Sequence, residues 1–223
     1  MEYKGFQNSK GNVTGVCVVV DCIAGTDAQV LDGLVENFSK DRSETILPVS
    51  IGYIRSKGDY IIPMLVQDIS DADDVIIDKV RTVDGVCDVK SYIFNLTVPE
   101  LAEGANAGPE PDDDEPLLCH GMLFVDVESG KDRHVLKTIS HSSDSSVQIN
   151  FLGHCFHSFD CDLVAFISAP DQNILHQWVR ENIRPIDGVL DTSVDVITGM
   201  EPLIGPDEMM KLMEILTDLE ENK

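Results

Sequence analysis

Apolar and polar residues follow two kinds of pattern along the chain, and the patterns occur twice in the same order. Short runs rich in β-branched residues, such as GVCVVVDC at 15–22, predict buried strands. Segments with apolar residues three and four positions apart, such as 27–40 and 172–183, predict amphipathic helices. Each half of the chain therefore reads strand, helix, strand, strand, helix, strand.

The two halves also share individual residues. RTVDGVCD at 81–88 corresponds to RPIDGVLD at 184–191, and the same offset of 103 residues aligns Asp59 with Asp162 and Asp68 with Asp171. Upstream, VDCIAGTDAQVL at 20–31 matches VDVESGKDRHVL at 125–136 at an offset of 105. The chain is thus predicted to contain a duplicated domain. Its repeated Gly85 and Gly188 are expected to end the second helix of each copy in a left-handed conformation.

The element order βαββαβ is typical of the ferredoxin-like fold, an antiparallel sheet with both helices on one face. Such a sheet needs a partner for its other face. We therefore expect an α+β protein in which two ferredoxin-like repeats pack as a dimeric α+β barrel within one chain. The expected domains are a first repeat at 1–101, an acidic Pro/Gly linker at 102–116, a second repeat at 117–203 and an amphipathic helix at 204–223.

Composition narrows the classes of partner. The chain has 40 acidic and 16 basic side chains and a net charge of −24, which disfavours direct binding to nucleic acid. The negative charge either keeps the protein soluble or is an adaptation to a cytoplasm of high salt concentration, and the sequence does not decide between these two explanations. No apolar run is long enough to span a membrane, and the N-terminus lacks a signal-peptide pattern. A cytoplasmic protein with six reduced cysteines is expected.

Both repeats resemble a known regulatory domain. FDCDLVAFISAPDQNILHQWVRENIRPIDGVLDTSVDVIT at 159–198, and the matching stretch at 58–98, resemble the effector-binding and assembly domain of Lrp/AsnC-type transcriptional regulators. The resemblance implies a small-molecule effector, a homo-oligomer and a regulatory role. The helix-turn-helix domain of that family has no counterpart here, so no DNA-reading domain is expected.

In that family, a turn ending in Asp lines the effector pocket. The resemblance carries this role to Asp59 and Asp162, and the expected ligand-binding set at the two turns is Gly58, Asp59, Tyr60, Phe159, Asp160 and Asp162. The family turn usually reads Gly-x-aromatic-Asp. This chain has Ser56 and Gly58 at the Gly and aromatic places in one copy, and Phe159 and Cys161 at those places in the other. The departures leave the effector unidentified.

The alternative reading is a haem- or metal-binding α+β-barrel enzyme. GHCFHSFDCD at 153–162 places Cys155, His157 and Cys161 where they could hold zinc or where His157 could be an axial haem ligand. His120, beside Cys119, could join them. The ungapped alignment places Ile51, Gly52, Ile54 and Gly58 at the matching positions of the first copy, so simple core packing is the other explanation.

No complete catalytic motif accompanies this cluster. Asp21 and Asp126 occupy equivalent places at the end of each first strand, where a carboxylate does acid–base work or accepts backbone hydrogen bonds from the next loop. A binding protein is therefore expected in preference to an enzyme, and no cofactor is expected unless the alternative holds.

The segment 206–223 predicts a methionine-rich helix with a broad apolar face. A helix of this length is marginal alone, so its face must dock. It packs on its own barrel or binds a protein partner.

Overall fold

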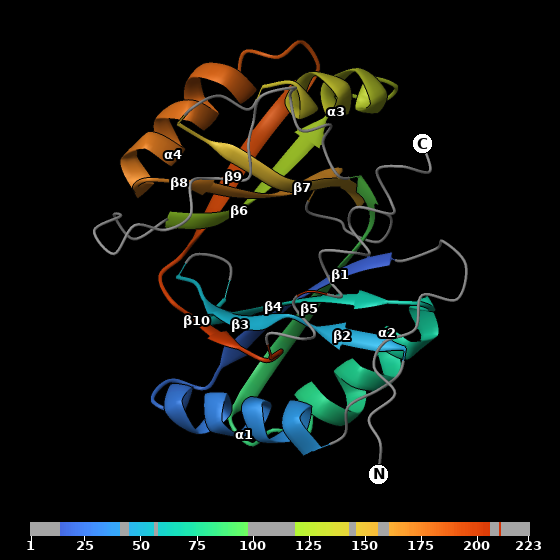
Figure 1. The fold of residues 1–223 in the computed structure, drawn as a ribbon, viewed down its shortest axis with the longest axis vertical. Helices are drawn as coiled ribbons and strands as arrows, with labels where there is room; N and C mark the ends of the chain where they lie inside the picture. Colours follow the sequence, from blue (N-terminus) through green and yellow to red (C-terminus); the bar gives the residue numbers. More distant parts are fainter. Residues whose placement is uncertain are drawn as a thin grey trace. The chain divides into compact units, whose positions relative to one another are not determined.

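A computed structural model describes residues 14–40, 45–55, 58–97, 119–142, 146–155, 161–205 and 210 (Figure 1). The chain divides into two compact units. Among the described residues, the first unit contains 14–95 and 198–205, and the second contains 119–155 and 161–197. The expected linker at 102–116, the segment 206–209 and most of the expected terminal helix lie outside the described residues, as do His157, Phe159 and Asp160.

The first unit is an antiparallel sheet with two helices. Its strands are β1 (Thr14–Cys22), β2 (Ile46–Pro48), β3 (Ser50–Tyr53), β4 (Tyr60–Val66), β5 (Val86–Thr97) and β10 (Met200–Pro202), and its helices are α1 (Asp27–Lys40) and α2 (Ile69–Val75). The sheet order is β10-β3-β4-β1-β5, with β2 also paired to β4. The second strand of the expected βαββαβ order is therefore two short strands here, β2 and β3.

The second unit repeats this arrangement. Its strands are β6 (Cys119–Val127), β7 (Gln148–Cys155), β8 (Leu163–Ala169) and β9 (Val189–Ile197), and its helices are α3 (Asp132–Ser140) and α4 (Gln172–Trp178). The order β7-β8-β6-β9 is again antiparallel. Both units thus have the predicted βαββαβ order, and the α+β class is confirmed.

Both helices of each unit lie on one face of its sheet (Figure 1). Their apolar stripes and alternate strand residues form one core per unit, as the sequence periodicities predicted. In the first unit Val30, Leu34 and Phe38 of α1 pack with Val16, Val18 and other strand residues. In the second, Val135 and Ile139 of α3 join Leu175 and Trp178 of α4 over the sheet.

The second helix of each unit begins and continues in the same way. Asp68 and Asp171, aligned in the repeat, are its N-caps, since each side chain accepts hydrogen bonds from backbone amides in the first turn. Each helix then widens into a five-residue π-helix, η1 (Ile76–Val80) and η2 (Val179–Ile183). The apolar pattern predicted the helices but not this change of hydrogen bonding.

The repeated Asp-Gly-Val corner does not end the helix as expected. The helix of the first unit ends at Val80, and Gly85 lies in the turn that follows, with a φ of +98°. Its carbonyl accepts a hydrogen bond from the Ile23 amide, with an N···O distance of 2.7 Å. A Cβ on Gly85 would lie 2.6 Å from Thr26 Oγ1. Glycine is therefore required both by the left-handed backbone and by the close approach to the loop after β1.

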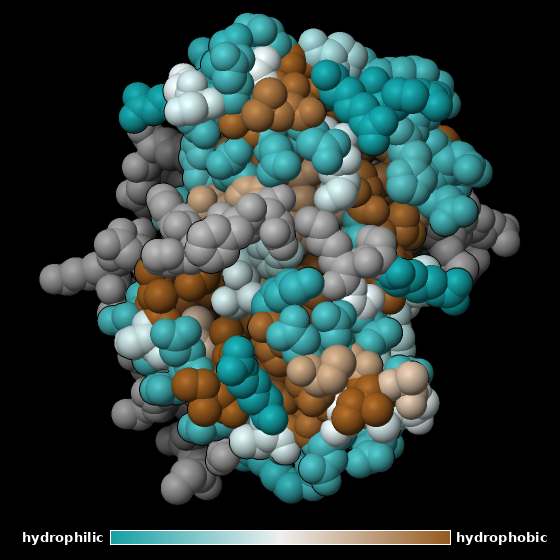
Figure 2. All heavy atoms as spheres, turned by 180° about the vertical axis from the view of Figure 1, so that it is seen from behind, coloured by the Kyte–Doolittle hydropathy of each residue, from teal (hydrophilic) through white to brown (hydrophobic). Residues whose placement is uncertain are grey.

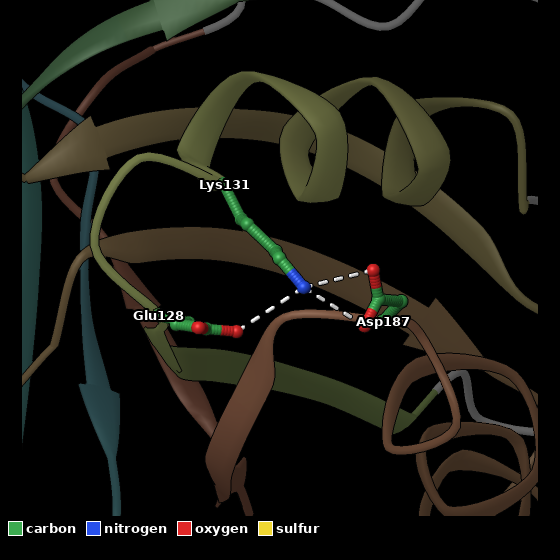
Figure 3. Close-up of polar contacts among 3 residues, drawn as sticks. All are labelled: Glu128, Lys131 and Asp187. Atoms are coloured by element: carbon green, nitrogen blue, oxygen red, sulfur yellow. Dashed lines mark hydrogen bonds and ion pairs between the residues drawn. The ribbon is translucent and has the colours of Figure 1, made fainter.

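The second unit builds the same corner with charged side chains. Gly188 also has a φ of +98°, and its carbonyl accepts from the Glu128 amide at 2.8 Å. Lys131 stands where the first unit has Thr26. Its Nζ lies 2.9 Å from Asp187 and 3.2 Å from Glu128 (Figure 3). These exposed ion pairs contribute little stability, although the hydrogen bond to Asp187 raises the pKa of Lys131.

The strand β10 belongs to the sheet of the first unit. Met200, Glu201 and Pro202 pair with β3, and the Tyr53 amide donates to the Gly199 carbonyl at 2.9 Å. The sequence assigned residues up to 203 to the second repeat. No pattern in a three-residue strand indicates which sheet edge it will join.

No helix within the described ranges is long and apolar enough to cross a membrane. The molecular surface mixes hydrophilic and hydrophobic residues (Figure 2). The large apolar side chains exposed among the described residues are Ile23, Ile69, Ile77, Leu190, Met200 and Met210.

Candidate functional site

The sheet faces turned away from the helices, which we call the helix-free faces, differ in chemistry between the units. Side chains alternate along a strand, so every second residue lies on this face. In the first unit it carries Cys17, Val19, Ile61, Leu65, Tyr92 and Phe94, all buried. In the second unit it carries His120, Asn150, Phe151, Phe166, Ser168 and Asp195 beside the buried apolar Met122 and Phe124. Asn150 and Phe151 share the face because the strand register shifts between Ile149 and Phe151. Polar groups that could act on a ligand therefore gather on the second unit.

His120 is the centre of this polar group. The strand register places it directly opposite Ser168 across β6 and β8. Its Nδ1 lies 2.8 Å from Ser168 Oγ, which also accepts a hydrogen bond from Asn150 Nδ2 at 2.7 Å. The ring orientation of His120 is thus fixed by a chain of hydrogen bonds through three neighbouring strands, in which Nδ1 is the nitrogen that is used.

Aromatic rings lie beside the imidazole. Phe166 stacks on His120 with ring centroids 5.5 Å apart and planes at 15°, and Phe151 stacks on Phe166 at 5.7 Å and 11°. The three rings are half-buried, so they form a nearly parallel strip. Asp195 on β9 belongs to the same face and is fully buried. Such a strip suits a flat molecule that stacks on rings and meets a polar group.

Burial sets the charge of the imidazole. It lowers the pKa of His120 below the ordinary value of 6.5, because the charged form loses its hydration. His120 is therefore neutral near pH 7. A neutral imidazole with one nitrogen held by a hydrogen bond can accept a proton or bind a metal with the other.

The equivalent positions of the first unit have none of this chemistry. The paired registers place Gly15 at the position of His120, Leu65 at that of Ser168 and Tyr92 at that of Asp195. The ring of Phe94 covers Gly15 so closely that a Cβ there would overlap it. The phenyl ring of Phe94 thus occupies, in the first unit, the space that the imidazole of His120 occupies in the second.

The aspartates expected at an effector pocket hold the backbone. Asp59 Oδ2 accepts from the Cys22 amide and Asp162 Oδ2 from the Val127 amide, each at 2.7 Å. Both amides stand at the irregularity where the first strand of each unit leaves its register. This shared bond explains why the repeat keeps both aspartates without invoking a ligand.

The other described members of the expected ligand set lie close to Asp59. Tyr60 is buried in the helix-side core and donates from Oη to the Asp27 carbonyl at 2.7 Å. Gly58 lies against Val19, where a Cβ would come within 2.6 Å of Cγ1. The turn in the first unit is therefore tightly packed.

Cys22, Asp27 and Asp59 form the group of potential metal ligands found among the described residues, with donor atoms within 4.8 Å of one another. Burial first, and Asp59 next, raise the pKa of the Cys22 thiol to about 12. The thiol is thus protonated at neutral pH and is a poor metal ligand as it stands.

Two members of the predicted His/Cys cluster come together. Cys155 Sγ and Cys161 Sγ are 3.3 Å apart, while His157 lies outside the described residues. His120 does not join them, since it bonds to Ser168. The alignment of this cluster also changes. His154 pairs with Leu163 as Tyr53 pairs with Tyr60, so Ile54 corresponds to Cys155 and the hairpin of the second unit is two residues longer.

The role of His120 was visible in the sequence only as a histidine beginning a strand. Its partners Asn150 and Ser168 are 30 and 48 residues away and are neither close in sequence nor arranged in a motif. Only the strand register brings them together.

Comparison with known proteins gives a fold and no family. No family model matches the chain, and no curated protein matches it. Among solved structures, chlorite dismutase from Candidatus Nitrospira defluvii in complex with imidazole is similar, with a TM-score of 0.56 and 12% identity over 95% of this chain and 96% of that one.

Two further structures are similar over most of their length. An anthrone oxidase-like protein has a TM-score of 0.56 and 5% identity, covering 86% of this chain and 94% of its own. A proposed monooxygenase from Lactobacillus acidophilus NCFM has a TM-score of 0.53 and 13% identity, covering 86% and 97%. At these identities the likeness shows the fold alone. It confirms the expected class, the tandem ferredoxin-like α+β fold of chlorite dismutase, and gives no support to membership of the Lrp/AsnC family.

Proposed function

We propose that the chain is an oxidoreductase-class enzyme that binds a flat, uncharged, conjugated small molecule on the helix-free face of the second unit. The observation that carries this proposal is the His120–Ser168–Asn150 hydrogen-bond chain beside the stacked rings of Phe151 and Phe166. The named enzyme activities of the similar structures favour an enzyme over the regulatory module expected from the sequence.

In this proposal His120 is the general base. Its neutral imidazole takes a proton from an activated C–H or O–H group of the bound molecule, and the resulting anion is what dioxygen oxidises. Phe151 and Phe166 orient the ring system, and Ser168 holds the imidazole. The four strands of the second unit contain no Lys or Arg, so the site favours an uncharged substrate over an anionic one.

A haem enzyme is the second candidate, favoured by the similarity to chlorite dismutase and by the chemistry of His120. A neutral imidazole anchored through one nitrogen fits axial ligation through Nε2. His120 would then hold the iron, and the haem would supply redox chemistry. The lack of Lys or Arg on these strands gives the haem propionates no cationic partner there, which is why this candidate ranks second.

Anthrone is a suitable probe for the first candidate, because it is flat, uncharged and carries an acidic methylene. Its oxidation balances as anthrone plus dioxygen giving anthraquinone plus water. Oxygen uptake with anthrone is expected for the wild type and should fall below pH 6.5 as His120 takes up a proton. His120→Ala should lose about two to four powers of ten in rate, whereas His134→Ala, on the exposed face of α3, should keep it.

Titration with hemin in the same variants separates the alternatives. A Soret band that requires His120 would favour the haem enzyme and overturn the base role. Binding of anthrone without oxygen uptake would favour a regulatory binding module. Oxygen uptake unchanged in His120→Ala would place the chemistry elsewhere.

A further inference from the structure

The hairpin between β7 and β8 carries two thiols at the point where the strands separate. Cys155 is the last residue of β7, and its amide donates to the Asp162 carbonyl at 2.8 Å, which fixes its backbone against the start of the neighbouring strand. Cys161 immediately precedes that residue. The two sulfur atoms lie 3.3 Å apart. The hairpin pairing therefore holds both thiols in place.

This arrangement is confined to one copy of the duplicated fold. In the first unit Ile54 occupies the position of Cys155, since its amide donates to the Asp59 carbonyl at 3.0 Å in the same way. Gly58 precedes Asp59 as Cys161 precedes Asp162. The fold closes this hairpin without any sulfur, so the pair of thiols is not needed to build it.

We propose that Cys155 and Cys161 are a redox-responsive dithiol that closes to a disulfide. A disulfide S–S bond is about 2.05 Å long, so the sulfur atoms need to approach by only about 1.3 Å. Cys155 is half-buried and Cys161 is buried. Cys155 is thus the thiol that an external oxidant reaches, and Cys161 is the thiol that resolves the product.

Glutathione disulfide is an oxidant of the appropriate class. The Cys155 thiolate attacks one sulfur of glutathione disulfide, forming a mixed disulfide and releasing one glutathione thiolate. The Cys161 thiolate then attacks Cys155 Sγ and releases the second. Two protein thiols lose two electrons and two protons, and one glutathione disulfide becomes two glutathione molecules. The product ties the end of β7 to the start of β8.

The test is mass spectrometry of the intact protein after equilibration with glutathione redox buffer and alkylation of the remaining thiols. The wild type should lose two of its six alkylatable thiols, and peptide mapping should link Cys155 to Cys161. Cys161→Ser should stop at a glutathione adduct on Cys155. Cys155→Ser should form no linked peptide. The control Cys87→Ser, which removes an exposed thiol of β5, should behave as the wild type.

Three results would overturn the proposal. The wild type could keep all six thiols in a buffer that oxidises ordinary protein dithiols, the linked peptide could join other cysteines, or Cys161→Ser could accumulate no more adduct than the wild type. A metal that protects both thiols until a chelator removes it would instead make the pair a metal site. The readout is covalent mass alone, so failure here leaves the proposed oxidation activity untouched, and the reverse also holds.

Discussion

The two units have one fold and two different helix-free faces. In the first, Gly15, Leu65 and Tyr92 line a face whose described residues are almost wholly apolar. In the second, the same register positions are His120, Ser168 and Asp195. The backbone bonds that define the fold are kept in both copies, including the aspartate that accepts an amide at the end of the first strand. The two copies thus keep the same backbone framework, while only the second has His120, Ser168 and Asp195 at these three positions.

The largest expected effect tests the corner that both copies share. Gly85→Ala forces a left-handed alanine, at about 1–2 kcal/mol, and pushes its Cβ against Thr26 and the buried Val30, at about 1–3 kcal/mol more. Gly188→Ala meets the same backbone strain, but the three atoms nearest to its Cβ all belong to the side chain of the partly exposed Lys131. Gly85→Ala should therefore destabilise more.

Urea unfolding followed by two signals would measure this difference. The single tryptophan, Trp178, reports the second unit by fluorescence, whereas far-ultraviolet circular dichroism reports both units. Equal losses of stability in the two variants would show that the strained backbone dominates and that the neighbouring side chains do not matter.

A second, smaller effect concerns the helix-free faces. Gly15→Ala should cost about 1–3 kcal/mol, because the new Cβ displaces the Phe94 ring in a packed region. His120→Ala should cost less, about 1 kcal/mol, since a half-buried side chain loses one hydrogen bond. The same urea unfolding curves would measure both. A larger loss for His120→Ala would mean that this imidazole holds the fold together, and the site assignment would weaken.

The smallest effect is a pH dependence that comes from two groups of the first unit. Burial raises the pKa of Cys22 and of Tyr60 to about 12, above the values of 9.0 and 10.0 that these groups have when unfolded. The unfolded chain therefore releases protons from pH 9 upward while the folded chain keeps them, so stability falls as the pH rises from about 9 to 12. The second unit has Val127 and Leu163 at these positions and lacks these two titrating groups.

Thermal unfolding between pH 8 and 10.5 would test this expectation. Cys22→Val, which copies the second unit, should reduce the fall in Tm, and Cys87→Ser should reduce it much less, because Cys87 makes the smallest contribution to the raised pKa of Cys22. If Cys22→Val and the wild type lost stability in parallel, Cys22 would not be a source of the alkaline sensitivity.

What the sequence predicted well was determined by local pattern. The strands, the amphipathic helices, the duplication and the left-handed conformation of Gly85 and Gly188 each follow from residues near one another in the chain, although these glycines lie in the turn after the helix and do not end it. The features that it missed leave the apolar pattern unchanged or depend on how the strands pair. The π-helices at Ile76 and Val179 change hydrogen bonds without changing the apolar stripe. Because the second hairpin is longer, Cys155 is structurally equivalent to Ile54. An ungapped alignment of the two copies could not detect this equivalence.

The candidate site was harder to predict for the same reason. The sequence predicted a metal or haem site in GHCFHSFDCD because the histidines and cysteines of this stretch are close in sequence. His120 acquires its partners only when β6, β7 and β8 lie side by side, so composition and spacing carried no signal for it. Cys155 and Cys161 do lie together, because a hairpin is a local structure, while the metal site predicted for them with His157 stays a prediction.

The sheet of the first unit is completed only after β10 has been synthesised. Residues 14–95 leave the ribosome long before Met200–Pro202, so the sheet of the first unit waits with the outer edge of β3 unpaired while the whole second unit is made. An open edge of this kind recruits other strands. A nascent or truncated chain that stops before residue 198 would thus expose the edge of β3 that β10 covers once it has been translated.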